Sequence, residues 1–325
     1  MIPGAAPAGL RTMRLWTHDR WRFPLPERHR FPIDKYALLR ERVVADGIVA
    51  PADVLEPDPA PWAWIEAVHD GALVERIRDG SLTLRESRGL GLPWSPELVE
   101  RARRAVAGSV EAARFALEHG LGMNLGGGTH HAGRDFARGY CLFNDAGVAL
   151  SLLRGEGRVG RALVVDCDVH QGDGTAQLLG PDPDAFTLSL HGARNYPFER
   201  IPSDLDVDLP SGTGDEEYLR VLEDSVETAL DSLPEPDLAF FLAGADPWEG
   251  DRLGRLALTK DGLRARDELV LDRLLETGAA VVVVLAGGYA PDVVDTVDIN
   301  AATVAAVAAR DGTRGRGPVG SGQPG

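Results

Sequence analysis

Four short apolar runs, separated by segments with a helical pattern, limit what this chain can fold into more than any other feature. The runs span residues 162–167, 185–190, 238–243 and 280–286. Each is long enough to form a strand that is buried on both faces. Helical patterns are found at residues 34–46, 97–119, 144–154, 215–233 and 259–277. Strands and helices that alternate in this way predict right-handed crossovers, and therefore one open, parallel α/β sheet with helices on both sides.

Polar side chains follow three of these apolar runs. Asp166, Asp168 and His170 lie at the end of the first run, Asp246 follows the third, and Tyr289 follows the fourth. Parallel sheets bind their ligands beyond the carboxyl ends of the strands. We therefore expect these side chains to meet at one rim of the sheet.

The alternate spacing of Asp166, Asp168 and His170 predicts a cation site. Side chains two residues apart in an extended segment face the same way. Two carboxylates and an imidazole would then share a small volume, where a divalent metal ion is the simplest way to offset their repulsion and desolvation. A hydrogen-bonded polar cluster at the end of a strand is the alternative. Asp246 would complete a three-ligand site with one open position, as catalytic zinc requires, although an aspartate there is also a common helix cap or turn residue.

Two further motifs carry groups suited to proton transfer and to stabilising negative charge. His130 and His131 directly follow three glycines and a threonine, and adjacent imidazoles can share the uptake and release of a proton near neutral pH. Tyr289 follows two glycines, where its phenol could donate a hydrogen bond to an oxyanion. Taken alone, the histidines could equally be surface or core residues, and the tyrosine could simply close a strand. Nucleotide binding by the glycines is disfavoured because no Lys-Ser/Thr pair follows them.

Composition argues against several classes of protein. The chain has 34 Lys+Arg against 50 Asp+Glu, a net charge of −16, so its average surface repels nucleic acids and acidic membranes. The longest apolar run, residues 279–286, is far shorter than the roughly 20 residues of a membrane-spanning helix. Cys141 and Cys167 both lie in apolar segments, which predicts two buried thiols and a cytoplasmic location. The acidic charge hints at basic protein tails or polyamines as substrates.

Together these segments resemble the histone deacetylase family, which includes acetoin-utilisation proteins and acetylpolyamine amidohydrolases. The matching motifs occur in the family's order between residues 15 and 309. Segments 168–174, 249–254 and 266–270 resemble class IV of the family in particular. It implies the arginase/deacetylase fold, a single catalytic domain over 15–309 with a sheet of about eight strands. Residues 1–14 are expected to be flexible, and the glycine-rich tail 310–325 to be disordered.

The resemblance also implies a role for each site residue. The metal ligands, with Zn²⁺ as the usual ion and Fe²⁺ as the alternative, would be Asp168, His170 and Asp246. The proton-transfer pair would be His130 and His131, oriented by Asp166 and Asp173 respectively. The residue that polarises the scissile carbonyl would be Tyr289. The substrate channel would be lined by Gly139, Tyr140 and Leu253. A structural monovalent cation, K⁺, would lie beside Ser189 and the backbone near Asp166.

The implied activity is metal-dependent hydrolysis of an amide. A metal-activated water would remove an acetyl or longer acyl group from lysine in a protein or peptide, from a polyamine or from another small amine. Two other functions stay open: a non-catalytic metal protein that binds acylated ligands, and an arginase-like ureohydrolase, which would need further metal ligands beside Asp246. In the loop 83–96, Glu86 is the one candidate for a carboxylate that clamps the substrate backbone.

Overall fold

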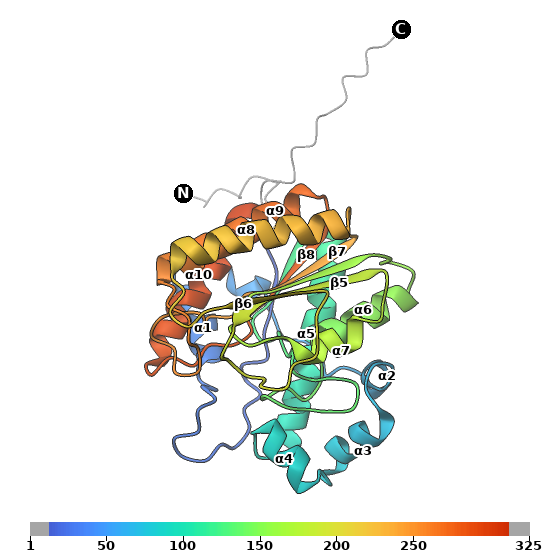
Figure 1. The fold of residues 1–325 in the computed structure, drawn as a ribbon. Helices are drawn as coiled ribbons and strands as arrows, with labels where there is room; N and C mark the ends of the chain where they lie inside the picture. The colour runs from blue at the N-terminus through green and yellow to red at the C-terminus, as the bar shows by residue number, and fades with distance from the viewer. Residues whose placement is uncertain (1–12, 312–325) are drawn as a thin grey trace, which may run out of the picture.

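A computed structural model describes residues 13–311, so the terminal segments expected to be flexible or disordered lie almost wholly outside the described residues. The described chain forms an eight-stranded sheet in the order β2-β1-β3-β8-β7-β4-β5-β6, and every strand pair is parallel (Figure 1). The strands are β1 (Leu15–Trp16), β2 (Val54–Leu55), β3 (Leu121–Asn124), β4 (Ala162–Asp166), β5 (Ala185–Gly192), β6 (Leu205–Leu209), β7 (Leu238–Leu242) and β8 (Ala280–Val284). The predicted open parallel α/β sheet is therefore confirmed.

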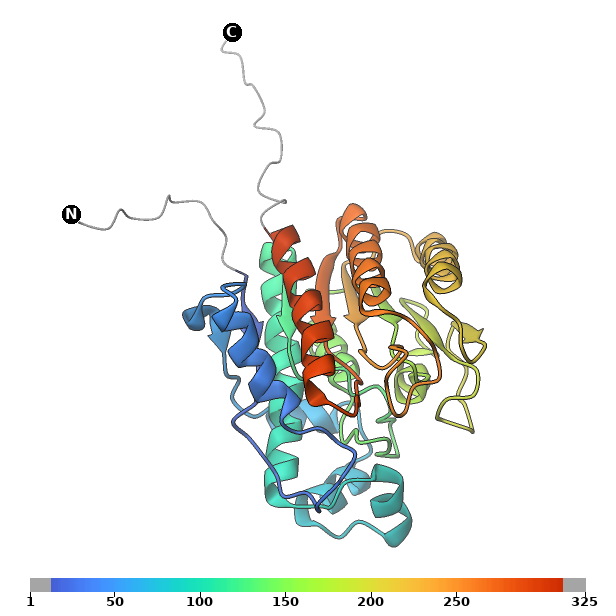
Figure 2. The same ribbon diagram turned by 90° about the vertical axis from the view of Figure 1, so that its left-hand side faces the viewer.

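Helices cover both faces of the sheet, as two perpendicular views show (Figures 1 and 2). The helices of one face are α1 (Lys35–Ala45), α8 (Asp215–Ser232), α9 (Lys260–Glu276) and α10 (Val293–Asp311). Those of the other face are α5 (Pro96–His119), α6 (Asp145–Gly155) and α7 (Asp173–Leu179). The central strands are buried throughout because each sends alternate side chains into both layers: Val165 packs in the first core and Val164 in the second.

A smaller helical layer extends the second face beyond the sheet. Its helices are α2 (Trp62–Glu66), α3 (Gly71–Asp79) and α4 (Leu84–Leu90), and a short 3-10 turn, η1 (Pro51–Asp53), precedes β2. Their apolar side chains form a third core with the first half of α5, around Ile65, Ile77 and Val106. This layer supplies one wall of the cavity described below. None of the described helices is both long enough and apolar enough to span a membrane.

Candidate active site

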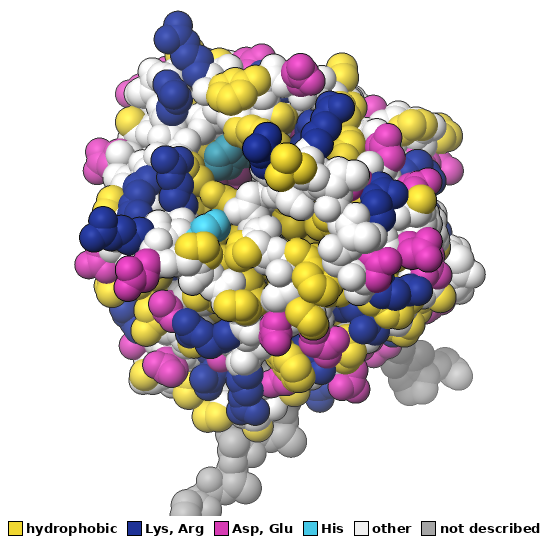
Figure 3. Space-filling model, turned by 90° about the horizontal axis from the view of Figure 1, so that it is seen from below, with side chains coloured by type: hydrophobic (Ala, Val, Ile, Leu, Met, Phe, Trp, Pro, Cys, Tyr) yellow, Lys and Arg dark blue, Asp and Glu magenta, His cyan; other side chains and the backbone are white. Residues whose placement is uncertain are grey.

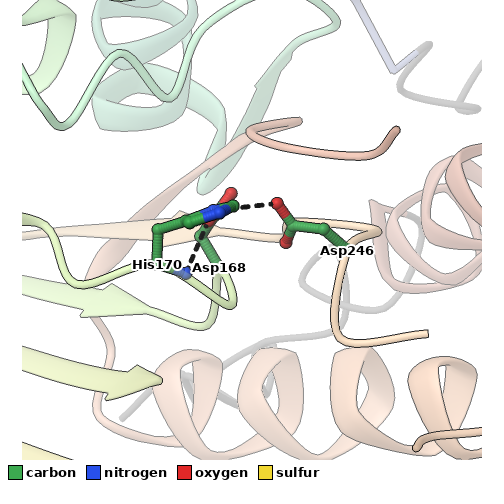
Figure 4. A group of neighbouring side chains, drawn as sticks. All are labelled: Asp168, His170 and Asp246. Atoms are coloured by element: carbon green, nitrogen blue, oxygen red, sulfur yellow. Dashed lines mark hydrogen bonds and ion pairs between the residues drawn. The ribbon is translucent and has the colours of Figure 1, made fainter. Parts of the chain in front are cut away.

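The loops that follow β4 and β7 bring together Asp168, His170 and Asp246. These strands are neighbours in the sheet, with Asp166 opposite Leu242. One oxygen or nitrogen atom from each of the three side chains lies within 4.8 Å of those of the other two, and all three residues are buried (Figure 4). Among the described residues this is the one group of three that could hold a metal ion. Cys167 and Val169, between the polar residues, point into the first core.

Backbone amides fix the two carboxylates of this group. Asp168 accepts a hydrogen bond from the amide of Gly287 at 2.6 Å, and Asp246 accepts one from the amide of Val169 at 3.0 Å. The second oxygen of Asp246, Oδ2, is buried without a hydrogen-bond partner among the described atoms. It lies 3.2 Å from Nδ1 of His170, and Oδ1 of Asp168 lies 2.8 Å from the same nitrogen. Two carboxylates and an imidazole facing one point, with a buried oxygen unsatisfied, fit a divalent cation.

The charges of this group favour a cation at its centre. Burial disfavours a charged imidazole, but the carboxylates of Asp168 and Asp246 outweigh burial and raise the pKa of His170 to about 10. Burial and the charge of Asp168 raise the pKa of Asp246 to about 6, against the opposing effect of His170. The carboxylates therefore stabilise positive charge at this point, which is the position of a metal ion in a three-ligand site.

His130 and His131 lie beside this group, and each is paired with its own carboxylate. Nδ1 of His130 is 2.6 Å from Asp166, and Nδ1 of His131 is 2.5 Å from Asp173. The two ring centroids are 4.2 Å apart, and Nε2 of His130 is 3.8 Å from Asp168. Since Nδ1 is engaged in both rings, Nε2 is the nitrogen through which each can exchange a proton.

The environments of the two histidines push their pKa values apart. Burial lowers the pKa of His130, but the carboxylates of Asp166 and Asp168 outweigh it and raise that pKa to about 9. Burial and the charge of His130 lower the pKa of His131 to about 4, although Asp173 acts in the opposite direction. A neutral imidazole next to a charged one is the arrangement in which one accepts and the other donates a proton.

These side chains open into one cavity of about 690 Å³. Its lining includes every predicted channel residue, namely Gly139, Tyr140 and Leu253, together with Tyr289. The Tyr289 ring lies 6.3 Å from that of His170 and 5.9 Å from that of Tyr140. Burial, followed by the charges of Asp168 and Asp246, raises the pKa of Tyr289 well above its usual value, so the phenol keeps its proton. Gly139 has a φ of +57°, and a Cβ there would lie 2.4 Å from Cδ2 of His131.

The predicted K⁺ site at Ser189 remains a prediction, whereas Glu86, the candidate for a substrate clamp, lies outside the cavity lining. Ser189 lies opposite Asp166 in paired strands, with its hydroxyl 2.9 Å from Nδ1 of His191, and the K⁺ site stays a prediction. Glu86 is not among the residues that line the cavity. Its carboxylate instead binds Arg76 at 2.5 Å and closes the first turn of α4 through Thr83. The candidate clamp is therefore a helix-capping residue in this chain.

Sequence reasoning missed two carboxylates that organise the site. Asp251 accepts hydrogen bonds from the amides of Leu253 at 2.7 Å and Tyr289 at 2.6 Å, and so holds two walls of the cavity together. Asp145 accepts from the amides of Gly128 and Thr129, at 3.0 and 2.8 Å, and fixes the glycine loop before the histidine pair. Neither has a clear sequence signal, because the amide of Tyr289 is 38 residues from Asp251, and the amides of Gly128 and Thr129 are 17 and 16 residues from Asp145.

Comparison with known proteins identifies the family. A sequence model described as the histone deacetylase domain matches residues 29–305. The chain belongs to the histone deacetylase family. It is 43% identical over 280 residues to an uncharacterized protein of Picosynechococcus sp., covering 86% of this chain and 93% of that one. It is 30% identical over 270 residues to histone deacetylase 2 of Arabidopsis thaliana, covering 80% of this chain and 70% of that one.

A solved structure shows the same fold. The crystal structure of an HDAC homologue from Aquifex aeolicus matches this histone deacetylase family member with a TM-score of 0.78 at 23% identity, covering 90% of this chain and 82% of the other. The predicted arginase/deacetylase fold is therefore confirmed. The buried Asp-His-Asp group of this family member could hold a metal ion.

Proposed function

We propose that this protein is a metal-dependent amidohydrolase that removes an acetyl or longer acyl group from an amine. Its substrate would be an acyl-lysine in a protein or peptide, or an acylated polyamine or other small amine. One observation carries the proposal: Asp168 and His170 of a buried metal-ligand set line one cavity with two histidines, and each of these histidines is paired with its own carboxylate. A binding protein has no need of such a proton-transfer pair.

The proposed metal ligands are Oδ1 of Asp168, Nδ1 of His170 and Oδ2 of Asp246. Two carboxylates and one imidazole suit Zn²⁺ and leave a coordination position open, with Fe²⁺ as the alternative. When bound there, the ion would polarise the scissile carbonyl and acidify a water molecule. The amides of Gly287 and Val169 keep both carboxylates oriented towards this point.

In the proposed mechanism, His131 accepts a proton from the attacking water. Asp173 supports this role because it holds the Nδ1 side of the ring and leaves Nε2 to face the reaction. A member of the histidine pair then returns a proton to the leaving amine, and Asp166 holds His130 in the matching orientation. Tyr289 donates its phenolic proton in a hydrogen bond to the developing oxyanion. Gly139, Tyr140 and Leu253 form the channel through which the acylated side chain enters.

The test is a turnover assay on the full chain, first stripped with a chelator and then reloaded with Zn²⁺ or Fe²⁺. The panel contains acetyl-lysine and longer acyl-lysine peptides, acetylpolyamines and small acyl-amines. We expect metal-dependent release of the free amine from at least one class. Absence of release from every substrate, in a sample shown to contain metal, would contradict the proposal.

A further inference from the structure

The outer end of the catalytic cavity is surrounded by arginines. Five arginines line the cavity; Arg101 is buried, and the other four, the mouth arginines, are exposed: Arg30, Arg194, Arg252 and Arg255. They come from three segments that are far apart in the sequence, so the cluster is a product of the fold. On the face seen in Figure 3, Lys and Arg side chains lie around a hollow in which a histidine is visible.

These arginines are not neutralised by carboxylates. Among the described residues that line the cavity, the one carboxylate is Asp168, which belongs to the proposed metal site. Arg30, Arg194 and Arg255 make no ion pair with a described carboxylate, and Arg252 donates only to the backbone carbonyls of Ala290 and Pro291. Four positive charges of this kind raise the local potential at the cavity entrance.

Two neighbouring arginines show the contrast. Arg138 is bonded to Asp173, and Arg200 is bonded to Asp208, so the positive charge of each is balanced. Asp251, which lies beside Arg252 in the sequence, makes no ion pair with it and instead accepts hydrogen bonds from three backbone amides. The mouth arginines are therefore left with their charge available to a ligand.

The positions of these arginines are tied to the walls of the channel. The carbonyls that hold Arg252 follow Tyr289 directly in the sequence. Burial raises the pKa of the Tyr140 phenol, and the positive charge of Arg30 lies close enough to oppose this rise. Arg194 precedes Tyr196 by two residues, and the ring of Tyr196 lies 4.9 Å from that of His131. The part of a substrate that stays outside the channel would therefore lie beside these exposed side chains.

From this charge distribution we infer that the substrate carries a carboxylate or phosphate group immediately outside its acylated amine. The inference rests on the proposed deacylase function and narrows it. Guanidinium groups bind carboxylates and phosphates through paired hydrogen bonds. A cationic carrier, such as an acetylated polyamine or a basic protein tail, is repelled at the same place. The net charge of −16 suggests a basic substrate, but the charge of the mouth arginines has the opposite sign and favours an acidic one.

The test compares substrates that differ only in charge. Three acetyl-lysine peptides carry Glu, Gln or Lys on both sides of the acetyl-lysine. A second arm uses single Nε-acetyl-lysine molecules whose α-amine is blocked. It compares the form with a charged α-carboxylate with the form with a neutral α-carboxamide. We expect kcat/KM to fall in the order Glu, Gln, Lys, with roughly a tenfold span at low salt that shrinks as salt is added. A preference for the carboxylate in the second arm alone would support a small-molecule source of the same charge.

Variants test whether the mouth arginines cause the dependence of kcat/KM on peptide charge. In the double variant Arg30→Gln/Arg255→Gln, the ratio of kcat/KM for the Glu and Lys peptides should move towards one. Arg264→Gln is the matched control, because Arg264 is exposed on α9 and is paired with Asp261 at 3.2 Å. It should keep the ratio of the parent protein.

The outcomes separate the two proposals. If no substrate is turned over in either arm, the proposed function fails. If the substrates are turned over but their charge makes no difference, or the Lys peptide is preferred, the inference about the mouth is overturned while the deacylase function stands.

Discussion

The guanidinium of Arg266 donates a hydrogen bond of 2.5 Å to the backbone carbonyl of Gly244, two residues before Asp246. The same nitrogen lies 3.4 Å from the carbonyl of Cys167, one residue before Asp168. Arg266 is completely buried, and Asp267 balances its charge at 2.7 Å. A single buried cation on α9 therefore links the two loops that carry the proposed metal ligands.

Replacing Arg266 should weaken metal binding as well as the fold. Arg266→Met leaves Asp267 as an uncompensated buried charge, which is expected to lower the free energy of unfolding by about 3–5 kcal/mol. The double variant Arg266→Met/Asp267→Asn contains no buried charge at this position and should recover much of this stability. Its metal affinity should stay about 10–100-fold below the parent value, because both loops lose their common anchor. Urea unfolding and metal titration measure the two effects; parental metal affinity in the double variant would refute the positioning role.

Gly139→Ala should impair catalysis through His131. The new Cβ would lie 2.4 Å from Cδ2 of His131, and the backbone φ of +57° is unfavourable for alanine. Gly47→Ala is a matched control, since Gly47 has a φ of +69° and a Cβ added there would meet no atom within 4 Å. Both variants should lose about 1 kcal/mol of stability from backbone strain. Only Gly139→Ala should also lose kcat, by about tenfold or more, and equal rates in the two variants would show that His131 tolerates the displacement.

Tyr289→Phe should separate catalysis from metal binding. The proposed role of Tyr289 is a hydrogen bond to the oxyanion, and loss of one such donor lowers kcat by about 10²–10³-fold. The ring remains, so its packing against Tyr140 and the metal content should not change. Steady-state kinetics on the metal-loaded protein, with metal analysis of the same sample, tests this. A change confined to KM would mean that the phenol only binds substrate.

Asp246→Asn should abolish tight metal binding with little change in shape. The variant retains the acceptor for the amide of Val169 but removes the negative charge that faces His170. The parent protein should bind one ion per chain, and saturation at 100 times the dissociation constant should stabilise it by about 2.7 kcal/mol. The exposed Asp261→Asn on α9 serves as the control and should bind as the parent does. Two tightly bound ions per chain would instead favour the ureohydrolase alternative.

The sequence predicted the elements that have a strong local pattern. The apolar runs became β4, β5, β7 and β8, and the five helical patterns became α1, α5, α6, α8 and α9. The strands it missed, β1, β2, β3 and β6, are short or contain polar residues, so their pairing depends on neighbours distant in the sequence. α10 was missed as well, although its buried face packs in the first core.

The same division holds within the site. Asp168, His170 and Asp246 follow apolar runs, and the parallel topology predicts that they meet at one point. Arg266 and the mouth arginines cannot be found in this way, because an arginine on a helix or loop has no local signal for what it contacts. Their roles depend on the charges that the fold places nearby, and these charges come from other segments.

The stability of the protein should depend on pH through His69, which contacts the loop that follows His130 and His131. Its Nδ1 donates to the carbonyl of Gly133 at 2.7 Å, and its Nε2 accepts from the amide of Asn144 at 3.0 Å. Both ring nitrogens are thus used by a neutral imidazole, and a second proton would replace the acceptor with a donor facing another N–H. Burial lowers the pKa of His69 to about 4, and the charge of Arg134 acts in the same direction, against the hydrogen bond to Gly133.

The folded-state pKa of His69 lies below the unfolded value of about 6.5, so the unfolded chain binds more protons between these two values. The stability that neutral His69 contributes is therefore fully present above pH 6.5 and is lost as the pH falls towards 4. His69→Gln is the matched variant, because an amide can donate and accept but does not titrate in this range. Between pH 7 and pH 5, the parent protein should lose about 2 kcal/mol of unfolding free energy relative to this variant. Urea unfolding of both proteins at each pH measures the difference, and a difference that does not change with pH would show that His69 is not held neutral by these contacts.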